Sequence, residues 1–400
     1  MLQPRAPEAP TQTRGSPRNT YLLGFVLLGV TLSFVGPSMS YVRGEVGASL
    51  SQGGLLAASQ SFGYIVTSVF VAKRFDKGHG HPTMVVAMAL VSVAVVMIDG
   101  ASLVWVAYCG FALVGAGAAT IDVGSNTLIA WSQPPQRVAT SLNLLHLCFG
   151  IGAIATPLIV ARSIDHTGGL AAVAAITTLG AVAMALAFMR TDQPKPRELP
   201  LGPRSVDHGY KRAVLYGVAA FFFVFAGAEA TMAVWITTWG EDLGLGDLGS
   251  PALLTAVFWI GFTLGRLTAV LATRRHRPIP ILLISCCVGS GTAGLLFLAQ
   301  GSEITTWICV AVLGGALGPQ YATMYGAVDQ FIGLDGRTTG RIVAAAGLGS
   351  LAVPAFSGFV LERHGTELLP AIVTVGLILS TAGVLLVRSS GSRSSGRFTS

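Results

Sequence analysis

The chain carries very little charge. Only 11% of its 400 residues are Asp, Glu, Lys or Arg, whereas a typical soluble protein carries about 25%. Hydrophobic residues make up 52% of the chain, and the mean hydropathy is +0.67. These values exclude an ordinary soluble fold and predict an all-α polytopic membrane protein in a lipid bilayer. The net charge of +7 does not indicate a nucleic-acid partner, because the basic residues fall in loops on one side of the predicted membrane.

The sequence also lacks the motifs of several other classes of protein. It has no GxxxxGK[ST] phosphate-binding loop, which argues against an ATP-driven pump. Its five cysteines all fall inside apolar segments without metal-ligand spacing, which predicts buried free thiols. Sparse buried charge and an internal two-fold repeat argue against a channel. We therefore expect no enzyme, no metal and no cofactor, apart from a proton or Na⁺ as coupling ion.

What the chain does have is long apolar runs. Twelve segments of roughly 20 residues are long enough to cross a bilayer as helices. They lie near residues 20–42, 51–72, 83–98, 103–130, 138–161, 169–189, 213–239, 251–272, 279–299, 304–328, 342–361 and 367–387. All but four of the 25 Lys and Arg residues fall in the two tails and in the loops on their side. The positive-inside rule then predicts a multi-pass protein of the cytoplasmic membrane with both termini in the cytoplasm.

One long polar segment divides the spans six and six. The predicted organisation is a disordered cytoplasmic tail at 1–19, an N-terminal six-helix bundle at 20–190, a cytoplasmic linker at 191–211, a C-terminal six-helix bundle at 212–388 and a second cytoplasmic tail at 389–400. The two halves repeat each other. Gly150, Gly152, Ala155, Pro157, Asp165 and Gly168 recur 197 residues later as Gly347, Gly349, Ala352, Pro354, Glu362 and Gly365. Duplicated halves with a substrate site between them describe one known transporter architecture.

The most informative stretch is 115–157, where two apolar segments flank the short sequence SQPPQ. That spacing predicts an antiparallel helical hairpin. Counted from the turn, Asp122 and His146 lie at one depth, and Asn126 and Asn143 lie at another. Asp122 and Asn126 are four residues apart and share one helix face. Four polar groups inside a membrane hairpin are costly there, which points to a function for them.

The whole chain resembles the major facilitator superfamily in its twelve spans, its two halves and its long central loop. That family has a signature loop after span 2, usually a Gly, an Asp-Arg pair and further basic residues. Here the loop reads AKRFDKGHGHP at 72–82, and its copy in the second half reads GFTLGRLTAVLATRR at 261–275. In the family these loops latch the cytoplasmic side, which implies a cytoplasmic gate of Asp76, Lys77 and Arg266. Ordinary positive-inside charge is the alternative interpretation of the basic residues.

Within the superfamily, the chain resembles the branch of the fucose permease and the glucose/mannose permease most closely. The matching patches are the pair Asp122 and Asn126, NTLI at 126–129, NLLHLCFGIGAIATPLI at 143–159, FAGAEATMAVWITTW at 225–239 and GPQYATM at 318–324. The resemblance implies that Asp122 matches the span 4 acid linked to proton coupling. The fucose permease also has an acid in span 1, where this chain offers only Thr31, Ser33, Ser38 and Ser40.

Two acids, Asp122 and Glu229, lie well inside predicted spans. A lone ion is costly there, so each is expected to be paired, hydrated or protonated. Together with His146 they form the predicted proton-coupling group. The alternative for Asp122 is a structural hydrogen bond to His146 or to a neighbouring helix, and a structural role is likewise the alternative for His146.

The predicted substrate-binding residues are polar or aromatic side chains within the spans. They are Asn126, Asn143, Glu229, Trp235, Gln320, Tyr321, Tyr325 and Gln60. Amides both donate and accept hydrogen bonds, which suits a hydroxyl-rich ligand but also suits interhelical bonding. An indole offers a flat apolar face to a sugar ring. Trp239 is assigned instead to the interfacial aromatic belt.

These features predict a monomeric secondary transporter that works by alternating access. The predicted substrate is a small polar molecule, a sugar or polyol taken up with a proton. The main alternative is proton-driven efflux of drug-like or amphipathic compounds, which would favour a wider aromatic and Met lining than the polar set of Asn126, Asn143 and Glu229. A substrate sensor on a transporter scaffold, an uncoupled facilitator and Na⁺ coupling remain open alternatives.

Overall fold

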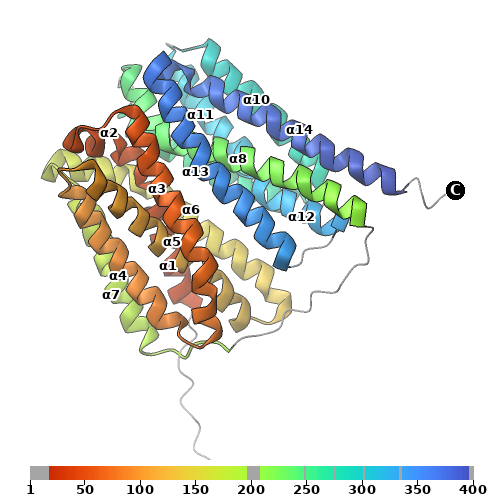
Figure 1. Ribbon diagram of the computed structural model, residues 1–400, viewed down its shortest axis with the longest axis horizontal. Coiled ribbons are helices and arrows are strands. Elements are labelled where there is room, and N and C mark those ends of the chain that lie inside the picture. The colour runs from red at the N-terminus through yellow and green to blue at the C-terminus, as the bar shows by residue number, and fades with distance from the viewer. Residues whose placement is uncertain are drawn as a thin grey trace, which may run out of the picture.

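The computed structural model describes residues 18–195, 208–246, 249–273, 275–300, 302–332 and 336–395, and these residues form helices joined by short turns (Figure 1). The elements are α1 (Arg18–Ser33), α2 (Val35–Val46), α3 (Leu50–Asp76), α4 (Gly80–Asp99), α5 (Val104–Ser132), α6 (Pro135–Thr167), α7 (Ala171–Phe188), α8 (His208–Asp242), α9 (Ala252–Ala272), α10 (Pro278–Leu298), α11 (Glu303–Leu317), α12 (Gln320–Ile332), α13 (Gly336–His364), the 3₁₀ turn η1 (Thr366–Leu368) and α14 (Leu369–Ser395).

Two of the twelve predicted spans are each built from two consecutive helices. Among the described residues, ten helices are long and apolar enough to cross a membrane, and α1 with α2 makes an eleventh span with a 44° bend. Helices α11 and α12 follow one another across Gly318 and Pro319 and take the place of the tenth predicted span. A proline has no N–H for the helical ladder, which accounts for the break. The all-helical twelve-span fold is thus confirmed.

Two predicted boundaries shift. Helix α1 begins at Arg18, so the last two residues of the predicted tail 1–19 are helical. Helix α14 continues to Ser395, well into the predicted tail 389–400, because no proline follows the apolar span to stop it. The rest of these tails and residues 196–207 of the predicted linker lie outside the described residues.

The predicted hairpin is present. Helix α5 ends at Ser132 and α6 begins at Pro135, so two residues connect them. Pro135 stands at the first helical position, where its missing N–H costs nothing and its fixed φ suits the helix. Helix α3 starts on a capping box, in which Ser49 and Gln52 each accept, through a side-chain oxygen, from the backbone N–H of the other.

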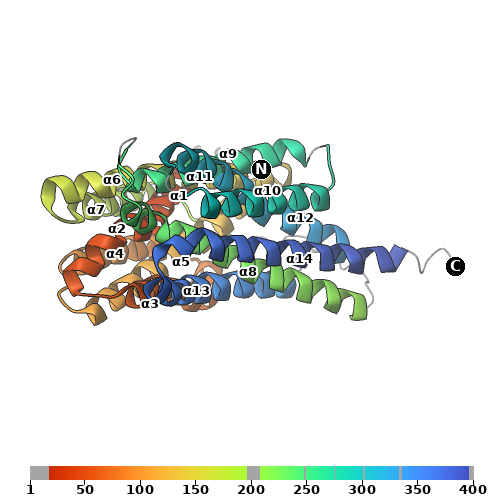
Figure 2. The same ribbon diagram turned by 90° about the horizontal axis from the view of Figure 1, so that it is seen from above.

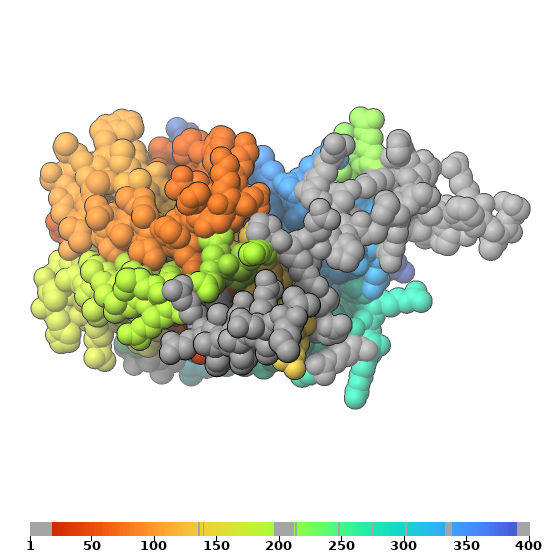
Figure 3. Space-filling view, turned by 90° about the horizontal axis from the view of Figure 1, so that it is seen from below, coloured from red at the N-terminus to blue at the C-terminus, as the bar shows by residue number. Residues whose placement is uncertain are grey.

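The helices form two bundles, α1–α7 and α8–α14, which lie side by side in Figure 1. Across the boundary α3 packs against α13 and α6 packs against α9. Seen from above in Figure 2, these two pairs lie in different layers of helices. In the view from below, orange and lime atoms of the first bundle gather on one side and blue and turquoise atoms of the second gather on the other (Figure 3).

The sequence repeat is matched by a repeat in packing. A Cβ at Gly152 would strike the carbonyl oxygen of Val26 on α1, and a Cβ at Gly349 would strike that of Phe223 on α8. Val26 and Phe223 are separated by the same interval as the two glycines. Small residues permit this close approach of helix backbones in lipid. The two bundles are therefore pseudo-symmetric copies.

Large apolar side chains cover the outside of the bundles. Phe62, Val69, Trp105 and Leu298 are between 58% and 81% exposed. In water such a surface would be unfavourable, whereas in a bilayer these side chains meet lipid tails of the same polarity. The polar chemistry of the spans therefore has to be sought between the helices.

Candidate functional site

A carboxylate on α5 is held by two hydrogen-bond donors. The hydroxyl of Tyr64 on α3 donates to Oδ2 of Asp122. The side-chain amide of Asn126, one turn along α5, donates to Oδ1 of Asp122 at 2.7 Å and to its carbonyl oxygen at 3.1 Å. Each carboxylate oxygen of Asp122 thus has a donor, and hydrogen bonds to an ionised acceptor are stronger than neutral ones.

The first bundle also contributes His146, which faces the second bundle. Nη1 of Arg266 on α9 lies 3.5 Å from Nδ1 of His146 on α6. The imidazole also meets Phe25 of α1 edge to face, with ring centroids 5.6 Å apart. His146 therefore contacts Arg266 and Phe25, whereas the hydrogen bonds to the Asp122 side chain come from Tyr64 and Asn126.

Arg266 is the one cation among these groups in the described part of the chain. Its guanidinium lies over the ring of Phe262, 4.5 Å from the centroid. Its charge interacts electrostatically with Glu229 on α8, with Tyr321 on α12 and with Asp122 across the boundary. One arginine thus lies within electrostatic range of a carboxyl group from each bundle, and Phe262 orients it through a cation–π contact.

Aromatic rings of the second bundle form one wall of this region. Tyr321 and Tyr325, four residues apart on α12, are stacked with centroids 5.3 Å apart, and their hydroxyls interact. Phe222 of α8 meets both rings edge to face, at 5.0 and 5.3 Å. We call the set of Tyr64, Asp122, Asn126, His146, Glu229, Arg266, Tyr321 and Tyr325 the central cluster.

The cluster is reachable by solvent. Asp122, Asn126, Glu229 and Arg266 are partly exposed, and His146 is exposed, although each lies well inside its helix. These side chains come from helices of both bundles, and His146 and Arg266 meet where α6 packs against α9. Polar groups that keep contact with water in this way avoid the full cost of burial.

The two bundles are tied together on the side where α2 ends. Ser40 Oγ lies 3.3 Å from Thr238 Oγ1, and the backbone N–H of Ser51 donates to Oε2 of Glu362 at 2.6 Å. Arg43 adds an electrostatic attraction to Glu362. On the other side of His146, toward the end where both termini lie, Asn143 is exposed. The cluster is therefore bounded by joined bundles on the α2 side.

Several predicted site residues lie elsewhere. Trp235 is fully buried between helices, and its indole N–H donates to the carbonyl oxygen of Pro354 at 3.2 Å. Gln320 is also fully buried; its amide donates to Ala316 at 3.0 Å, and its oxygen lies 3.4 Å from the thiol of Cys286. Both side chains are satisfied by helix packing, so the structure does not bring them to the central cluster.

The other residues singled out in the sequence also differ in their distance from the central cluster. Gln60 lies one turn from Tyr64 on α3 and is 7% exposed. Asp76 and Lys77 are exposed at the end of α3, away from Arg266, which sits in the central cluster. Trp239 is fully buried. Its assignment to the interfacial belt is therefore wrong, because belt residues face the lipid headgroups and this side chain is covered by protein.

Sequence reasoning missed Tyr64. It stands among apolar residues of span 2, and its partner Asp122 lies on another helix. A tyrosine hydroxyl at mid-span needs a hydrogen-bond partner just as an amide does. A tyrosine within an apolar span was therefore the sequence feature that could have identified this residue.

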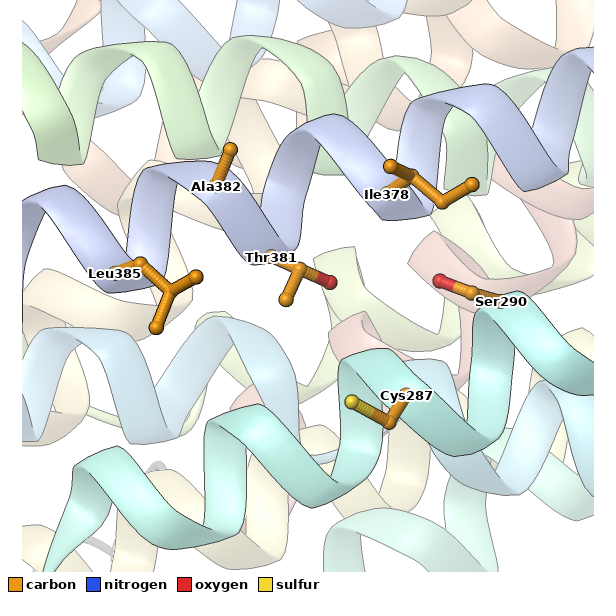
Figure 4. A pocket seen from close by; sticks show the side chains of 6 residues that line it. All are labelled: Cys287, Ser290, Ile378, Thr381, Ala382 and Leu385. Atoms are coloured by element: carbon orange, nitrogen blue, oxygen red, sulfur yellow. The ribbon is translucent and has the colours of Figure 1, made fainter.

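A groove also lies between α10 and α14, away from the central cluster (Figure 4). It measures about 470 Å³ and is lined by Cys287, Ser290, Ile378, Thr381, Ala382 and Leu385. The hydroxyls of Ser290 and Thr381 donate to carbonyl oxygens of their own helices. The groove therefore offers mainly apolar contact, with both of its hydroxyls already bonded within their helices.

Comparisons with known proteins agree with this architecture. A curated relative, sodium-dependent glucose transporter 1A of Mus musculus, is 23% identical and is matched over 90% of this chain and 92% of its own length. Sodium-dependent glucose transporter 1 of Homo sapiens is 22% identical over 90% of this chain and 76% of its own length. The fucose permease branch stays a prediction.

The fold is shared with a solved transporter. The crystal structure of a mutant of nucleoside transporter NupG superposes with a TM-score of 0.73 over 94% of this chain and all of that chain, at 12% identity. The family model described as Major Facilitator Superfamily matches residues 21–354. This chain therefore belongs to the major facilitator superfamily of membrane transporters.

Proposed function

We propose that this chain is a proton-coupled symporter for a neutral sugar or polyol, working by alternating access. The observation that carries the proposal is the position of Arg266, which interacts with a carboxyl group from each bundle, Asp122 and Glu229. Coupling requires that the ion and the solute both shift the equilibrium between the inward-facing and outward-facing states. A cation that is attracted by two carboxyl groups on opposite bundles offers that link.

Charge balance supports the binding of a proton. Asp122 and Glu229 carry two negative charges when ionised, and Arg266 supplies one positive charge. An uncompensated charge inside a membrane protein is unfavourable, so one carboxyl group at a time needs a further cation. When Asp122 binds a proton it becomes neutral, and Arg266 would then be attracted mainly to Glu229. When Asp122 loses the proton, its negative charge would attract Arg266 back toward α5.

The hydrogen bonds at Asp122 leave neither carboxylate oxygen free for a metal ion, whereas a proton requires only that the hydroxyl of Tyr64 turn from donor to acceptor. Both carboxylate oxygens accept from donors, the hydroxyl of Tyr64 and the amide of Asn126. A Na⁺ ion at those oxygens would meet the hydrogens of both donors. Sodium coupling is the second candidate, because the names of the two relatives describe them as sodium-dependent.

The lining supports a hydroxylated, uncharged solute. Asn126, Asn143 and Glu229 provide donors and acceptors, and the stacked rings of Tyr321 and Tyr325 provide an aromatic wall. Few polar groups set against aromatic surface are typical of small-molecule sites. The two relatives are named as glucose transporters, which agrees with this class of solute.

Glu229 takes the place of the acid that the fucose permease has in span 1 and that this chain lacks there. It lies on α8, the first helix of the second bundle, as α1 is the first helix of the first bundle. The pseudo-symmetric axis therefore relates the helix that bears Glu229 to the helix without an acid. We assign proton coupling to Asp122 with Arg266, solute binding to Glu229, and orientation of Arg266 to His146.

The remaining features of the transporter follow from the charge pattern and the closure of the bundles. We place both termini and the linker at 191–211 in the cytoplasm, with 20–190 and 212–388 as the two moving bundles of a monomer. With that orientation the contacts on the α2 side close the extracellular face, and we assign the structure to the inward-facing state. Asp76 and Lys77 stay at the cytoplasmic face, where they would meet the opposite bundle only in the outward-facing state.

A thermal-shift screen of the purified protein tests the proposal. A ligand that binds only the folded state raises its melting temperature by an amount set by concentration over affinity. We expect stabilisation by D-glucose or a related hexose or polyol, and none by lipophilic cations. Stabilisation by lipophilic cations with no response to any sugar would instead support the efflux alternative.

A further inference from the structure

Helix α9 presents a stripe of side chains to α6 beyond Arg266. Arg266 faces His146, and the next turn brings Thr263 against Gly150 of α6. One turn further, the ring of Trp259 meets Phe149 of α6 edge to face at 5.7 Å. Residues spaced three and four apart lie on one helix face, so Trp259 lies on the same inter-bundle seam as Arg266, about 10 Å along it.

Trp259 carries a polar atom that the fold leaves without a partner. The indole is 6% exposed, and its Nε1–H is buried with no hydrogen-bond acceptor among the described residues. The rings around it belong to Phe149, Phe258 and Phe262, at 5.7, 5.4 and 5.2 Å, and none of them accepts a conventional hydrogen bond. Buried indole N–H groups usually find a partner, and an unmet donor raises the free energy of the folded state.

We infer that Trp259 is a solute-binding residue whose indole N–H donates to one hydroxyl of the transported sugar. This inference rests on the proposed function. The residue lies on the boundary between the bundles, on the side of Arg266 toward the closed end, where a solute bound above the central cluster would stop. The same ring offers an apolar face to the C–H groups of the sugar, as indoles do for such rings.

The chain offers a matched control. Trp239 of α8 is also fully buried, and its Nε1–H likewise lacks a partner among the described residues. It lies ten residues beyond Glu229, or about 15 Å along the helix, near the end of α8. Trp259→Phe and Trp239→Phe each remove an unpartnered indole N–H and keep an aromatic ring, and Trp239 lies away from the proposed site.

The test measures binding of D-glucose and its 2-, 3-, 4- and 6-deoxy analogues to wild type, Trp259→Phe and Trp239→Phe by titration calorimetry. Thermal unfolding without ligand first shows that each variant is folded. We expect Trp259→Phe to bind glucose about 3- to 10-fold more weakly, the effect of one hydrogen bond, and Trp239→Phe to match wild type. One deoxy analogue should bind wild type and Trp259→Phe equally well. That analogue lacks the hydroxyl that accepts from the indole N–H, so removal of the N–H costs it no hydrogen bond.

The deoxy series separates a contact from a packing effect. A purely structural change would weaken all analogues by the same factor, and this pattern would overturn the inference. Unchanged glucose affinity in Trp259→Phe would also overturn it while leaving the proposed function standing. Wild-type protein that binds none of the sugars would reject the proposed function and this inference together.

Discussion

The two bundles carry different chemistry at equivalent places. In the first bundle a Cβ on Gly115 would meet the backbone of Gln60 and Tyr64, and in the second a Cβ on Gly314 would meet that of Phe258 and Phe262. Tyr64 therefore corresponds to Phe262. Seven residues after each glycine stand Asp122 and Tyr321, and four later stand Asn126 and Tyr325.

This correspondence shows how a duplicated scaffold has divided its work. The first bundle has a hydroxyl at Tyr64 that holds the carboxylate of Asp122, whereas the second has a plain ring at Phe262 under the guanidinium of Arg266. The polar groups that we propose to bind a proton lie in the first bundle, and the aromatic wall lies with Arg266 in the second. The following variants test that division, from the largest expected effect to the smallest.

Arg266→Gln should have the largest effect because it removes the charge that both bundles share. Its loss leaves a carboxyl group in each bundle without the cation that attracts it, which is unfavourable inside a membrane protein. We expect transport to fall by about 100-fold. Uptake of radiolabelled glucose into proteoliposomes measures this, and Arg275→Gln, an exposed arginine one turn beyond α9, is the control. Uptake within about threefold of wild type would remove Arg266 from the mechanism.

Asp122→Asn should separate coupling from binding. The amide keeps the size of the side chain but can neither take up a proton nor attract Arg266. We expect accumulation against a gradient to be lost, while exchange of internal for external glucose stays within about threefold of wild type. Counterflow and gradient-driven uptake in the same proteoliposomes measure the two properties. A variant that still concentrates glucose would show that Asp122 is not the coupling group.

Glu229→Gln should change binding more than coupling. Its side chain would still donate and accept but would lose the strong charged acceptor for a sugar hydroxyl. We expect glucose affinity to fall about tenfold, equivalent to about 1.4 kcal/mol, with the accumulation ratio at saturating glucose little changed. Titration calorimetry and proteoliposome uptake test the two halves of this prediction, and unchanged affinity would place Glu229 outside the solute site.

Tyr64→Phe should have the smallest effect, because it makes the first bundle resemble the second at this position. Asp122 keeps its bond from Asn126 and loses only that from Tyr64. We expect accumulation to fall about two- to fivefold, the effect of one hydrogen bond, with glucose affinity unchanged. Tyr41→Phe is a close control, since Tyr41 donates to Asp99 at 3.0 Å on the α2 side, away from the cluster. Equal loss in the two variants would contradict a specific role for Tyr64.

The division of labour was only partly predictable from the sequence. The short turn after Ser132 predicted the hairpin, and the acid in each half identified Asp122 and Glu229. The residues that interact with these acids lie on other helices: Tyr64 on α3 for Asp122, and Arg266 on α9 for Glu229. Helical periodicity places a side chain on a face but does not say which helix will meet it.

Aromatic residues were the hardest to assign. Trp235 and Trp259 both lie in apolar spans, yet the first donates to Pro354 and the second has an N–H without an acceptor among the described residues. The acceptor for Trp235 is a backbone carbonyl on another helix, and the sequence does not show which indole will lie beside such a carbonyl. Arg266 was assigned to the cytoplasmic gate by its loop motif, and its long side chain instead reaches the central cluster, as arginine side chains can.

The most direct test of the account is whether glucose carries protons. Proteoliposomes with a pH-sensitive dye in a weakly buffered external medium, at equal pH on both sides and without sodium, receive a pulse of D-glucose. We predict that the external medium becomes more alkaline with wild-type protein and does not change with Asp122→Asn. Glucose uptake without any proton movement, or uptake only after sodium is added, would contradict proton coupling through the central cluster.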